Sequence, residues 1–234
     1  MKQRSFIVIM VCLFMGAFMN ATAQDWANLN RFKEENAKLG PARTCDERIV
    51  FMGNSITQGW IEKVPEFFAN GKYINRGISG QTTPQMLIRF RQDVVNLYPK
   101  VVVILAGTND IAGNTGPSSL DMIMDNIASM TDIAQSRGIQ VILCSVLPAY
   151  DFPWSPGKEP AEKIVELNKQ IKELARIRGA VYCDYFSAMA DERNGLPTHL
   201  AQDGIHPTKE GYAIMQPLVE RAIAQALLMW KGFK

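Results

Sequence analysis

The chain has 234 residues, enough for one domain with a substantial core. Hydrophobic residues make up 47% and charged residues 21%, proportions typical of a soluble globular protein and not of a disordered, collagen-like or disulfide-dense one. The formal net charge is only +2 and there is no basic run, which argues against a nucleic-acid or anionic-membrane partner.

The chain begins with the features of a secretory signal peptide over residues 1–23. A basic start precedes an apolar run over residues 6–18, and Ala21-Thr22-Ala23 offers an A-x-A cleavage site. An uncleaved membrane anchor is the alternative, but the run is shorter than the ~20 residues that a spanning helix needs. We therefore expect cleavage after Ala23 and an exported protein, periplasmic or extracellular, with no stable membrane anchor.

Residues 24–234 are expected to form a single domain. Its first segment, residues 25–39, favours a helix with Trp26, Leu29 and Phe32 at helical spacing, ended by a Gly-Pro pair. We expect this leading helix to pack across the body of the domain.

Four short apolar runs have the character of strands in a buried parallel sheet: residues 49–52, 101–105, 141–144 and 180–183. Residues 72–75 predict a further, weaker strand. Segments with apolar residues at helical spacing lie between and after them, beginning near Thr82, Ser118, Pro160 and Thr208. Alternating strands and helices predict a three-layer α/β sandwich with a five-stranded parallel sheet, whose ligands bind at the carboxyl ends of the strands.

Ser55 directly follows the first of these strands, in the segment GNSITQG. A serine at a strand-to-helix turn presents its hydroxyl at the sheet edge, close to helix-terminal amides that stabilise an oxyanion. The alternative is that Ser55 only caps the next helix.

Two further segments follow the second and third strands. Gly77, in NRGISG, can bring a backbone N–H close to a substrate, and Asn109, in GTND, supplies a neutral side-chain N–H. Both residue types also serve ordinary turns, and neither segment distinguishes the two roles alone.

Asp203 stands three residues before His206, in the segment DGIHPT. A carboxylate at that spacing can reach the far nitrogen of the imidazole and fix its tautomer, while the near nitrogen takes the serine proton. A solvated loop histidine beside a surface Asp is the alternative. The second histidine of the chain, His199, is a rival base but lacks a carboxylate at a suitable spacing.

Together GNSITQGW, NRGISGQT, GTND and DGIHPT resemble the four blocks of the SGNH/GDSL hydrolase family, in the family's order. The resemblance implies a flavodoxin-like strand order, Ser55, Asp203 and His206 as catalytic residues, and Ser55, Gly77 and Asn109 as the oxyanion hole. It also suggests similarity to platelet-activating-factor acetylhydrolase-like and carbohydrate acetylesterase members. The family usually has Asp before the nucleophile, whereas this chain has Asn54, for which we expect a structural role.

Three aromatic residues are candidates for substrate binding: Trp60, Tyr150 and Trp154. The last two lie in a Pro-rich loop after the fourth strand, and their rings either stack on a sugar, line an acyl pocket or pack the loop onto the body. The spacings of cysteine and histidine match no metal site, so we expect neither metal nor cofactor, and Cys144 and Cys183 to be buried thiols.

The expected activity is ester hydrolysis through an acyl-Ser55 intermediate, with a small-molecule or glycan ester as substrate. Export and the aromatic loop favour removal of acetyl groups from a carbohydrate. A lysophospholipase or lipase-like esterase is the alternative, and an inactive glycan-binding protein with the same fold is a more distant one. The sequence leaves the oligomeric state open.

Overall fold

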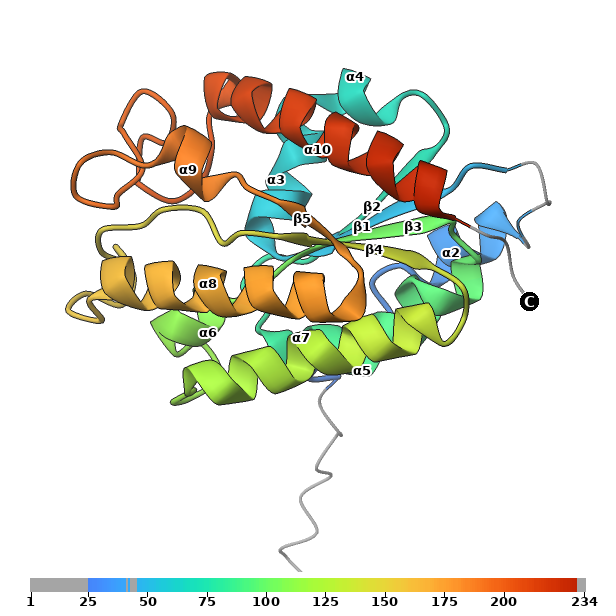
Figure 1. The fold of residues 1–234 in the computed structure, drawn as a ribbon, viewed down its shortest axis with the longest axis horizontal. Helices are drawn as coiled ribbons and strands as arrows, with labels where there is room; N and C mark the ends of the chain where they lie inside the picture. Colours follow the sequence, from blue (N-terminus) through green and yellow to red (C-terminus); the bar gives the residue numbers. More distant parts are fainter. Residues whose placement is uncertain (1–24, 41, 43–45, 231–234) are drawn as a thin grey trace, which may run out of the picture.

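Figure 1 shows a computed structural model of the chain, in which residues 25–40, 42 and 46–230 are described. The expected signal peptide and Cys45 lie outside these residues.

The centre of the fold is a sheet of five parallel strands. In chain order these are β1 (Ile49–Gly53), β2 (Tyr73–Gly77), β3 (Val101–Leu105), β4 (Gln140–Cys144) and β5 (Val181–Cys183). Their order across the sheet is β2-β1-β3-β4-β5, which confirms the α/β prediction and the flavodoxin-like order. The chain leaves β1 towards one edge and returns to β3, so a crevice is expected at the carboxyl ends of β1 and β3.

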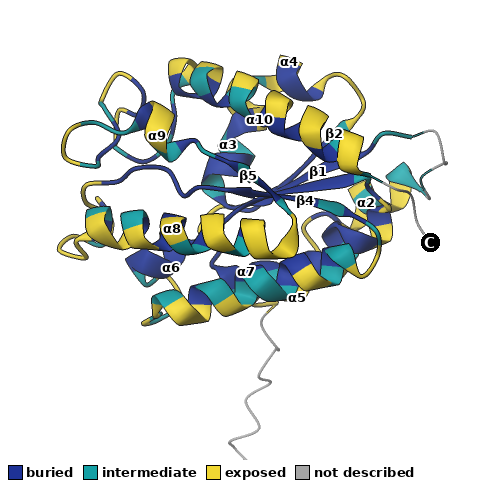
Figure 2. Cartoon of the chain, viewed as in Figure 1, coloured by how far each residue is buried: buried dark blue, intermediate teal, exposed yellow. Residues whose placement is uncertain are grey.

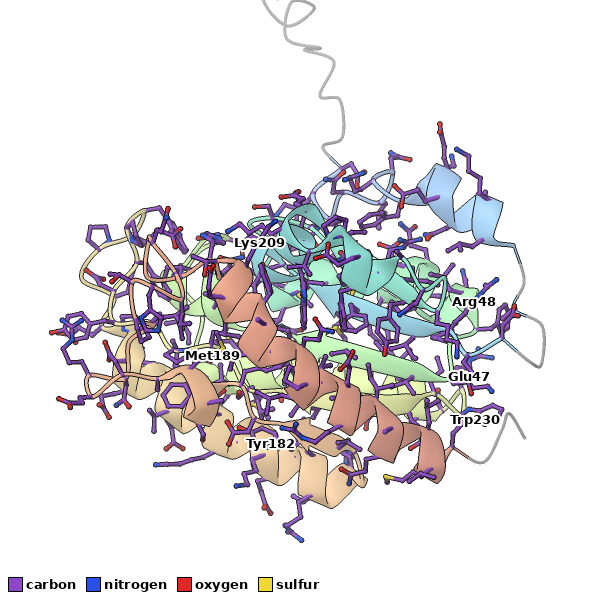
Figure 3. The ribbon with its side chains drawn as sticks, turned by 90° about the horizontal axis from the view of Figure 1, so that it is seen from above. Glu47, Arg48, Tyr182, Met189, Lys209 and Trp230 are labelled. Carbon is purple, nitrogen blue, oxygen red and sulfur yellow. The ribbon has the colours of Figure 1, made fainter. Side chains whose placement is uncertain are left out.

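Helices cover both faces of the sheet (Figure 1). One face carries α5 (Thr83–Asp93), α7 (Leu120–Gln135) and α8 (Pro160–Arg178); the other carries α3 (Ser55–Lys63), α4 (Pro65–Phe68) and α10 (Lys209–Met229). Figure 3, seen from above, shows α10 crossing its face from Lys209 towards Trp230. The remaining elements are short: α2 (Lys33–Leu39), η1 (Val95–Leu97), α6 (Thr108–Ala112) and α9 (Phe186–Met189). Within the described ranges, no helix is both long and apolar enough to cross a bilayer.

Alternate residues of each strand supply the two halves of the core, as the pleat requires. In β1, Val50 and Met52 pack in the cluster beneath α5, α7 and α8, whereas Ile49 and Phe51 pack in the cluster beneath α3, α4 and α10. Strands are therefore buried on both faces, as the dark central ribbons in Figure 2 show. This explains why the sequences of β1 and β3 are apolar runs without alternation.

The helix expected over residues 25–39 is wrong in its first half: α2 begins only at Lys33, after turns. Hydrogen bonds to side chains replace the backbone hydrogen bonds that a helix would form there. The Asp25 carboxylate accepts from the N–H groups of Leu29 and Asn30 at 2.8 and 3.1 Å. The Leu29 carbonyl in turn accepts from Gln92 Nε2 of α5 at 2.5 Å, so contacts distant in sequence set the path of this segment.

Cys144 and Cys183 are paired Cα partners on β4 and β5. Both are buried and free, as predicted, and burial raises the pKa of the Cys144 thiol well above its usual range. Both side chains are therefore part of the core.

Candidate active site

Ser55 lies at the turn between β1 and α3. Gly53, two residues before Ser55, cannot carry a side chain, because a Cβ there would collide with the Thr57 side chain. Asn54 is buried and caps α3, its Oδ1 accepting from the N–H of Ile56 at 3.2 Å. The residue that departs from the family pattern therefore holds the turn, the structural role expected for it.

The structure brings Ser55, His206 and Asp203 together in one hydrogen-bonded row. Ser55 Oγ lies 2.9 Å from His206 Nε2, and His206 Nδ1 lies 2.6 Å from Asp203 Oδ2. The loop that carries the last two turns at Gly204, whose φ of 74° favours glycine. A residue following β1 and a loop preceding α10, 151 positions apart, thus meet at the carboxyl end of the sheet.

The second carboxylate oxygen of Asp203 fixes the loop itself, accepting from the N–H groups of Ile205 and His206 at 3.0 and 2.8 Å. Partial burial by itself raises the pKa of Asp203, but the bonds from the His206 ring and from the two backbone N–H groups outweigh it. The pKa of Asp203 therefore lies below its ordinary value. Asp203 is charged at neutral pH and holds the proton of the imidazole on Nδ1, which leaves Nε2 free to accept a proton from Ser55.

Two predicted oxyanion donors lie at the same edge of the sheet. The Ser55 N–H belongs to the first turn of α3, where amides have no partner within the helix. Asn109, in the first turn of α6, is buried, and its Nδ2 donates to the Gln81 carbonyl at 2.9 Å. An amide nitrogen carries two protons, so this bond orients Asn109 and leaves one N–H for a substrate.

The assignment of Gly77 to the oxyanion hole is wrong. Its N–H already donates to Asn75 Oδ1 at 2.9 Å, and a Cβ on it would collide with the backbone of Gln58. Gly77 is the last residue of β2 and is glycine because α3 packs against it. Gly80 fits the role better: its φ is 78°, its Cα faces open space, and its N–H forms no hydrogen bond within the described part of the chain.

The assignment of Trp60 to substrate binding is also wrong. Its side chain is only 2% exposed and is stacked between Phe67 and Tyr212, with ring centroids at 4.8 and 5.2 Å. Position 60 lies one turn after Ile56 on the face of α3 that covers the sheet, so Trp60 is a core residue.

Trp154 and Tyr150 are in positions suited to substrate contact. Trp154 is 44% exposed, its ring centroid lies 6.2 Å from that of His206, and its Nε1 donates to Asn114 Oδ1 at 2.9 Å. Asn114, which sequence analysis missed, also donates to the Gly80 carbonyl at 3.1 Å. It therefore links the aromatic side of the site to the loop after β2.

A cavity of about 410 Å³ adjoins the site on the Asp203 side. Tyr150 lines it, is 57% exposed, and carries the Arg193 guanidinium 4.8 Å above its ring. Gln202 and Leu196 line it as well, so the cavity offers an aromatic face together with polar side chains.

His199 is not part of this arrangement. It is exposed, and its backbone carbonyl accepts from Thr208 Oγ1 at the start of α10. The described residues also contain no group of three or more His, Cys, Asp or Glu placed to hold a metal ion.

Comparison with known proteins agrees with this geometry. Residues 51–214, more than half of the chain, match the sequence profile of the GDSL-like lipase/acylhydrolase family. The chain belongs to this family. GDSL enzymes are hydrolases of ester bonds, and the match spans the turn with Ser55 and the loop with Asp203 and His206.

Individual proteins are similar to this chain in sequence or in fold. A GDSL-like lipase from Bacteroides thetaiotaomicron is 46% identical with a TM-score of 0.83, over 86% of this chain and 98% of that one. Subunit alpha2 of platelet-activating factor acetylhydrolase IB from Rattus norvegicus is 26% identical over 74% of each chain. A catalytic mutant of an acetylxylan esterase from Geobacillus stearothermophilus shares the fold, with a TM-score of 0.62 at 20% identity over 76% of this chain and 94% of that one.

Proposed function

We propose that the chain is a serine esterase that removes short acyl groups, acetyl above all, from a carbohydrate through an acyl-Ser55 intermediate. The mechanism rests on the hydrogen-bonded row Ser55–His206–Asp203. Ser55 Oγ lies 2.9 Å from His206 Nε2, and His206 Nδ1 lies 2.6 Å from Asp203 Oδ2. These separations are within reach for proton transfer from the serine to the imidazole and for orientation of the imidazole by the carboxylate.

In the first step Ser55 Oγ attacks the acyl carbon and its proton passes to His206 Nε2. The carbonyl oxygen becomes an oxyanion, which the Ser55 N–H, the Asn109 side chain and the Gly80 N–H stabilise. When the tetrahedral intermediate collapses, the bond to the alcohol breaks and the imidazolium returns its proton to the leaving oxygen. Asp203 stays charged throughout and stabilises the imidazolium.

In the second step a water molecule takes the place of the alcohol. His206 Nε2 accepts a proton from this water, whose oxygen attacks the acyl carbon in the same oxyanion hole. Collapse returns the proton to Ser55 Oγ and releases the carboxylic acid. Both steps use the same base and the same donors.

The carbohydrate preference is supported by the surface beside the base. Exposed aromatic rings flanked by polar side chains suit a sugar, whose faces are apolar and whose edges are polar. Trp154 lies beside His206, and the cavity lined by Tyr150 and Gln202 adjoins Asp203. The names of two relatives, an acetylhydrolase and an acetylxylan esterase, also favour an acetyl group. Export from the cytoplasm, as the sequence predicts, would place the enzyme where polysaccharides occur.

The test is hydrolysis of p-nitrophenyl esters from acetate to dodecanoate, followed by acetate release from acetylated xylo-oligosaccharides. We expect the highest kcat/KM on acetate, a steep fall with chain length, and loss of on the order of 10³–10⁶ in kcat in Ser55→Ala and His206→Asn.

Two control variants match these substitutions. Ser129→Ala, on the outer part of α7, and His199→Asn should both keep wild-type rates. A rate that rises with chain length would replace the deacetylase proposal by a lipid esterase. Equal rates in wild type and Ser55→Ala would overturn the mechanism, and an inactive wild type that binds oligosaccharide would indicate a glycan-binding protein.

A further inference from the structure

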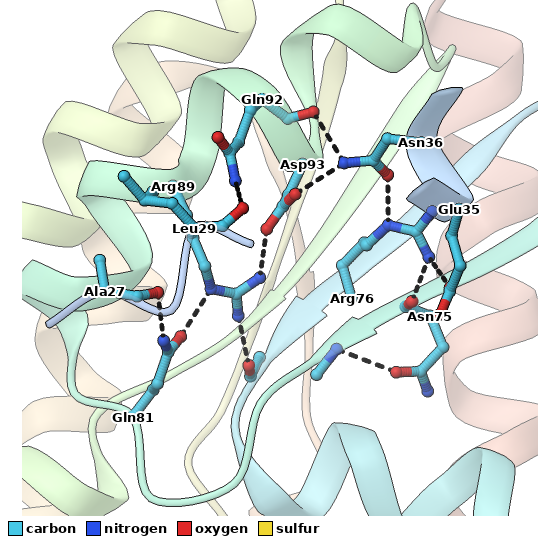
Figure 4. Close-up of polar contacts among 12 residues, drawn as sticks. Ala27, Leu29, Glu35, Asn36, Asn75, Arg76, Gln81, Arg89, Gln92 and Asp93 are labelled. Carbon is cyan, nitrogen blue, oxygen red and sulfur yellow. Dashed lines mark hydrogen bonds and ion pairs between the residues drawn. The ribbon is translucent and has the colours of Figure 1, made fainter. Parts of the chain in front are cut away.

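A buried polar network contacts the end of β1, two residues before Ser55. Figure 4 shows the side chains of Arg89, Gln81 and Asp93 that form it. Its centre is Arg89 of α5, a guanidinium with no solvent exposure. We call it the Arg89 network and define it as Arg89, Gln81, Asp93 and the Gly53 carbonyl.

Arg89 joins three parts of the fold. Its Nε donates to Gln81 Oε1 at 2.5 Å, one terminal nitrogen donates to Asp93 Oδ2 at 3.1 Å, and the other donates to the Gly53 carbonyl at 2.9 Å. Gly53 is the last residue of β1, two positions before Ser55. A rigid planar group therefore fixes the distance between the nucleophile turn and the loop after β2.

Gln81 carries the network on to the oxyanion donors. Its backbone carbonyl accepts from Asn109 Nδ2 at 2.9 Å, and it follows Gly80 directly in the chain. Its side chain is buried and used at both ends: Oε1 accepts from Arg89, and Nε2 donates to the Ala27 carbonyl at 2.8 Å. Two of the three proposed oxyanion donors, Asn109 and Gly80, thus depend on where Gln81 sits.

The N-terminal segment closes the network from outside. Asn36 of α2 donates to Asp93 Oδ1 at 2.8 Å and accepts from Arg76 Nε at 2.9 Å, while the Ala27 carbonyl accepts from Gln81 (Figure 4). Asp93, like Arg89, has no exposed side-chain surface.

Stability alone does not account for such an arrangement. Burial lowers the pKa of Arg89 to about 10, which reflects the cost of removing this charge from water. Replacing a buried ion pair by apolar residues of similar size is often neutral or stabilising. What an apolar pair cannot do is hold Gly53 and Gln81 at fixed separations through directed hydrogen bonds.

We propose that Arg89 and Gln81 are positioning residues that set the oxyanion hole against Ser55. Neither touches the substrate; Arg89 acts through the Gly53 carbonyl, and Gln81 acts through Asn109 and Gly80. The inference rests on the proposed function, because the oxyanion hole has a role only if Ser55 forms an acyl intermediate.

The experiment measures kcat and KM for p-nitrophenyl acetate beside melting temperature. Gln81→Met removes the hydrogen bond between Gln81 and Arg89 and leaves the Arg89–Asp93 ion pair intact. The double variant Arg89→Met, Asp93→Leu removes the hydrogen bonds from Arg89 to Gln81 and to the Gly53 carbonyl. Because both members of the ion pair are replaced, neither is left buried without its partner. Gln92→Met is the matched control, because the Gln92 side chain also ties α5 to the N-terminal segment, but it does so through the Leu29 carbonyl and not through Gly53 or Gln81.

A displacement of about 1 Å at a reacting centre costs about 10² in rate, and loss of one oxyanion donor costs about 10²–10³. We therefore expect kcat to fall about 10- to 100-fold in Gln81→Met and in the double variant, with KM changed less than about threefold. The melting temperature of Gln81→Met should fall by several degrees, because Arg89 Nε and the Ala27 carbonyl lose their buried hydrogen-bond partner. Gln92→Met should keep wild-type kcat.

Wild-type kcat in a folded Gln81→Met, or an equal loss in Gln92→Met, would overturn the inference. A double variant that does not fold leaves Gln81→Met to decide. Failure of the proposed function has a different signature, since wild type would then be no faster than Ser55→Ala, and the inference would fall with it.

Discussion

Replacing Asp203 by Asn changes one charged group and leaves the shape of the site almost unchanged. In the folded chain Asp203 Oδ1 accepts from two backbone N–H groups, and Oδ2 faces His206 Nδ1 at 2.6 Å. In Asp203→Asn the amide oxygen must stay on the backbone donors, so the new NH₂ group turns to the imidazole. The imidazole must then carry its proton on Nε2 and can no longer accept one from Ser55.

The size of the effect follows from exposure. Two unit charges about 4 Å apart interact by about 1 kcal/mol in water and about 4 kcal/mol near a protein surface. The His206 and Asp203 side chains are 36% and 46% exposed, so a value of about 2 kcal/mol is reasonable for the lost stabilisation of the imidazolium. This corresponds to about 30-fold in rate. The unfavourable tautomer adds to it, and we expect kcat to fall by about 10²- to 10⁴-fold in all.

The assay is kcat on p-nitrophenyl acetate at pH 8 for wild type, Asp203→Asn and a control, Asp132→Asn. Asp132 lies on α7, pairs with Arg178 at 2.8 Å and is remote from the sheet edge with Ser55. Asp132→Asn should keep the wild-type kcat. An Asp203→Asn protein that retains more than about a third of the wild-type kcat would refute the assignment of Asp203 as the residue that orients His206.

Four further outcomes are expected. Trp154→Ala should raise KM for an acetylated xylo-oligosaccharide about 3- to 10-fold with little change in melting temperature, whereas Trp60→Ala should lower the free energy of unfolding by about 3–5 kcal/mol in urea titrations. Gly77→Ala should lower it by about 1–3 kcal/mol, because the new methyl group meets the backbone of Gln58. Because the folded-state pKa of Asp203 lies below its unfolded value, its contribution to stability is present above about pH 4 and is lost as the pH falls through the folded value. The difference in melting temperature between wild type and Asp203→Asn should accordingly shrink as the pH falls below about 4 and disappear in stronger acid.

Short-range patterns predicted most of the fold. Runs such as 101–105 are apolar at every position because both faces of β3 are buried, and this property is visible in the residues themselves. The pairing of Asp203 with His206 could also be predicted from the sequence. The two residues are three positions apart in a tight loop, and this short spacing decides whether the carboxylate reaches the imidazole.

The errors concern residues whose environment is made by distant segments. The sequence after Asp25 predicts a helix, but two of its backbone carbonyl groups accept hydrogen bonds from the Gln81 and Gln92 side chains instead. The choice between Gly77 and Gly80 depends on where β2 ends and on how closely α3 packs against it, neither of which a motif contains.

Burial of polar residues is equally hard to read from spacing. Arg89 and Asp93 stand four residues apart, a pattern that usually marks an exposed ion pair on a helix. Here both are fully buried, because Gly53, Gln81 and Asn36 supply partners from three other segments. The burial of Trp60 could have been predicted from the sequence, because Trp60 and Ile56 are spaced like residues on the core-facing side of a helix.

The most direct test of Ser55 as the nucleophile is to locate the covalent adduct of a fluorophosphonate probe by peptide mass spectrometry. The mechanism requires one adduct per chain, on the peptide that contains Ser55, formed rapidly in wild type, slowly in His206→Asn and absent in Ser55→Ala. An unlabelled wild type, or an adduct on another serine that persists in Ser55→Ala, would contradict it.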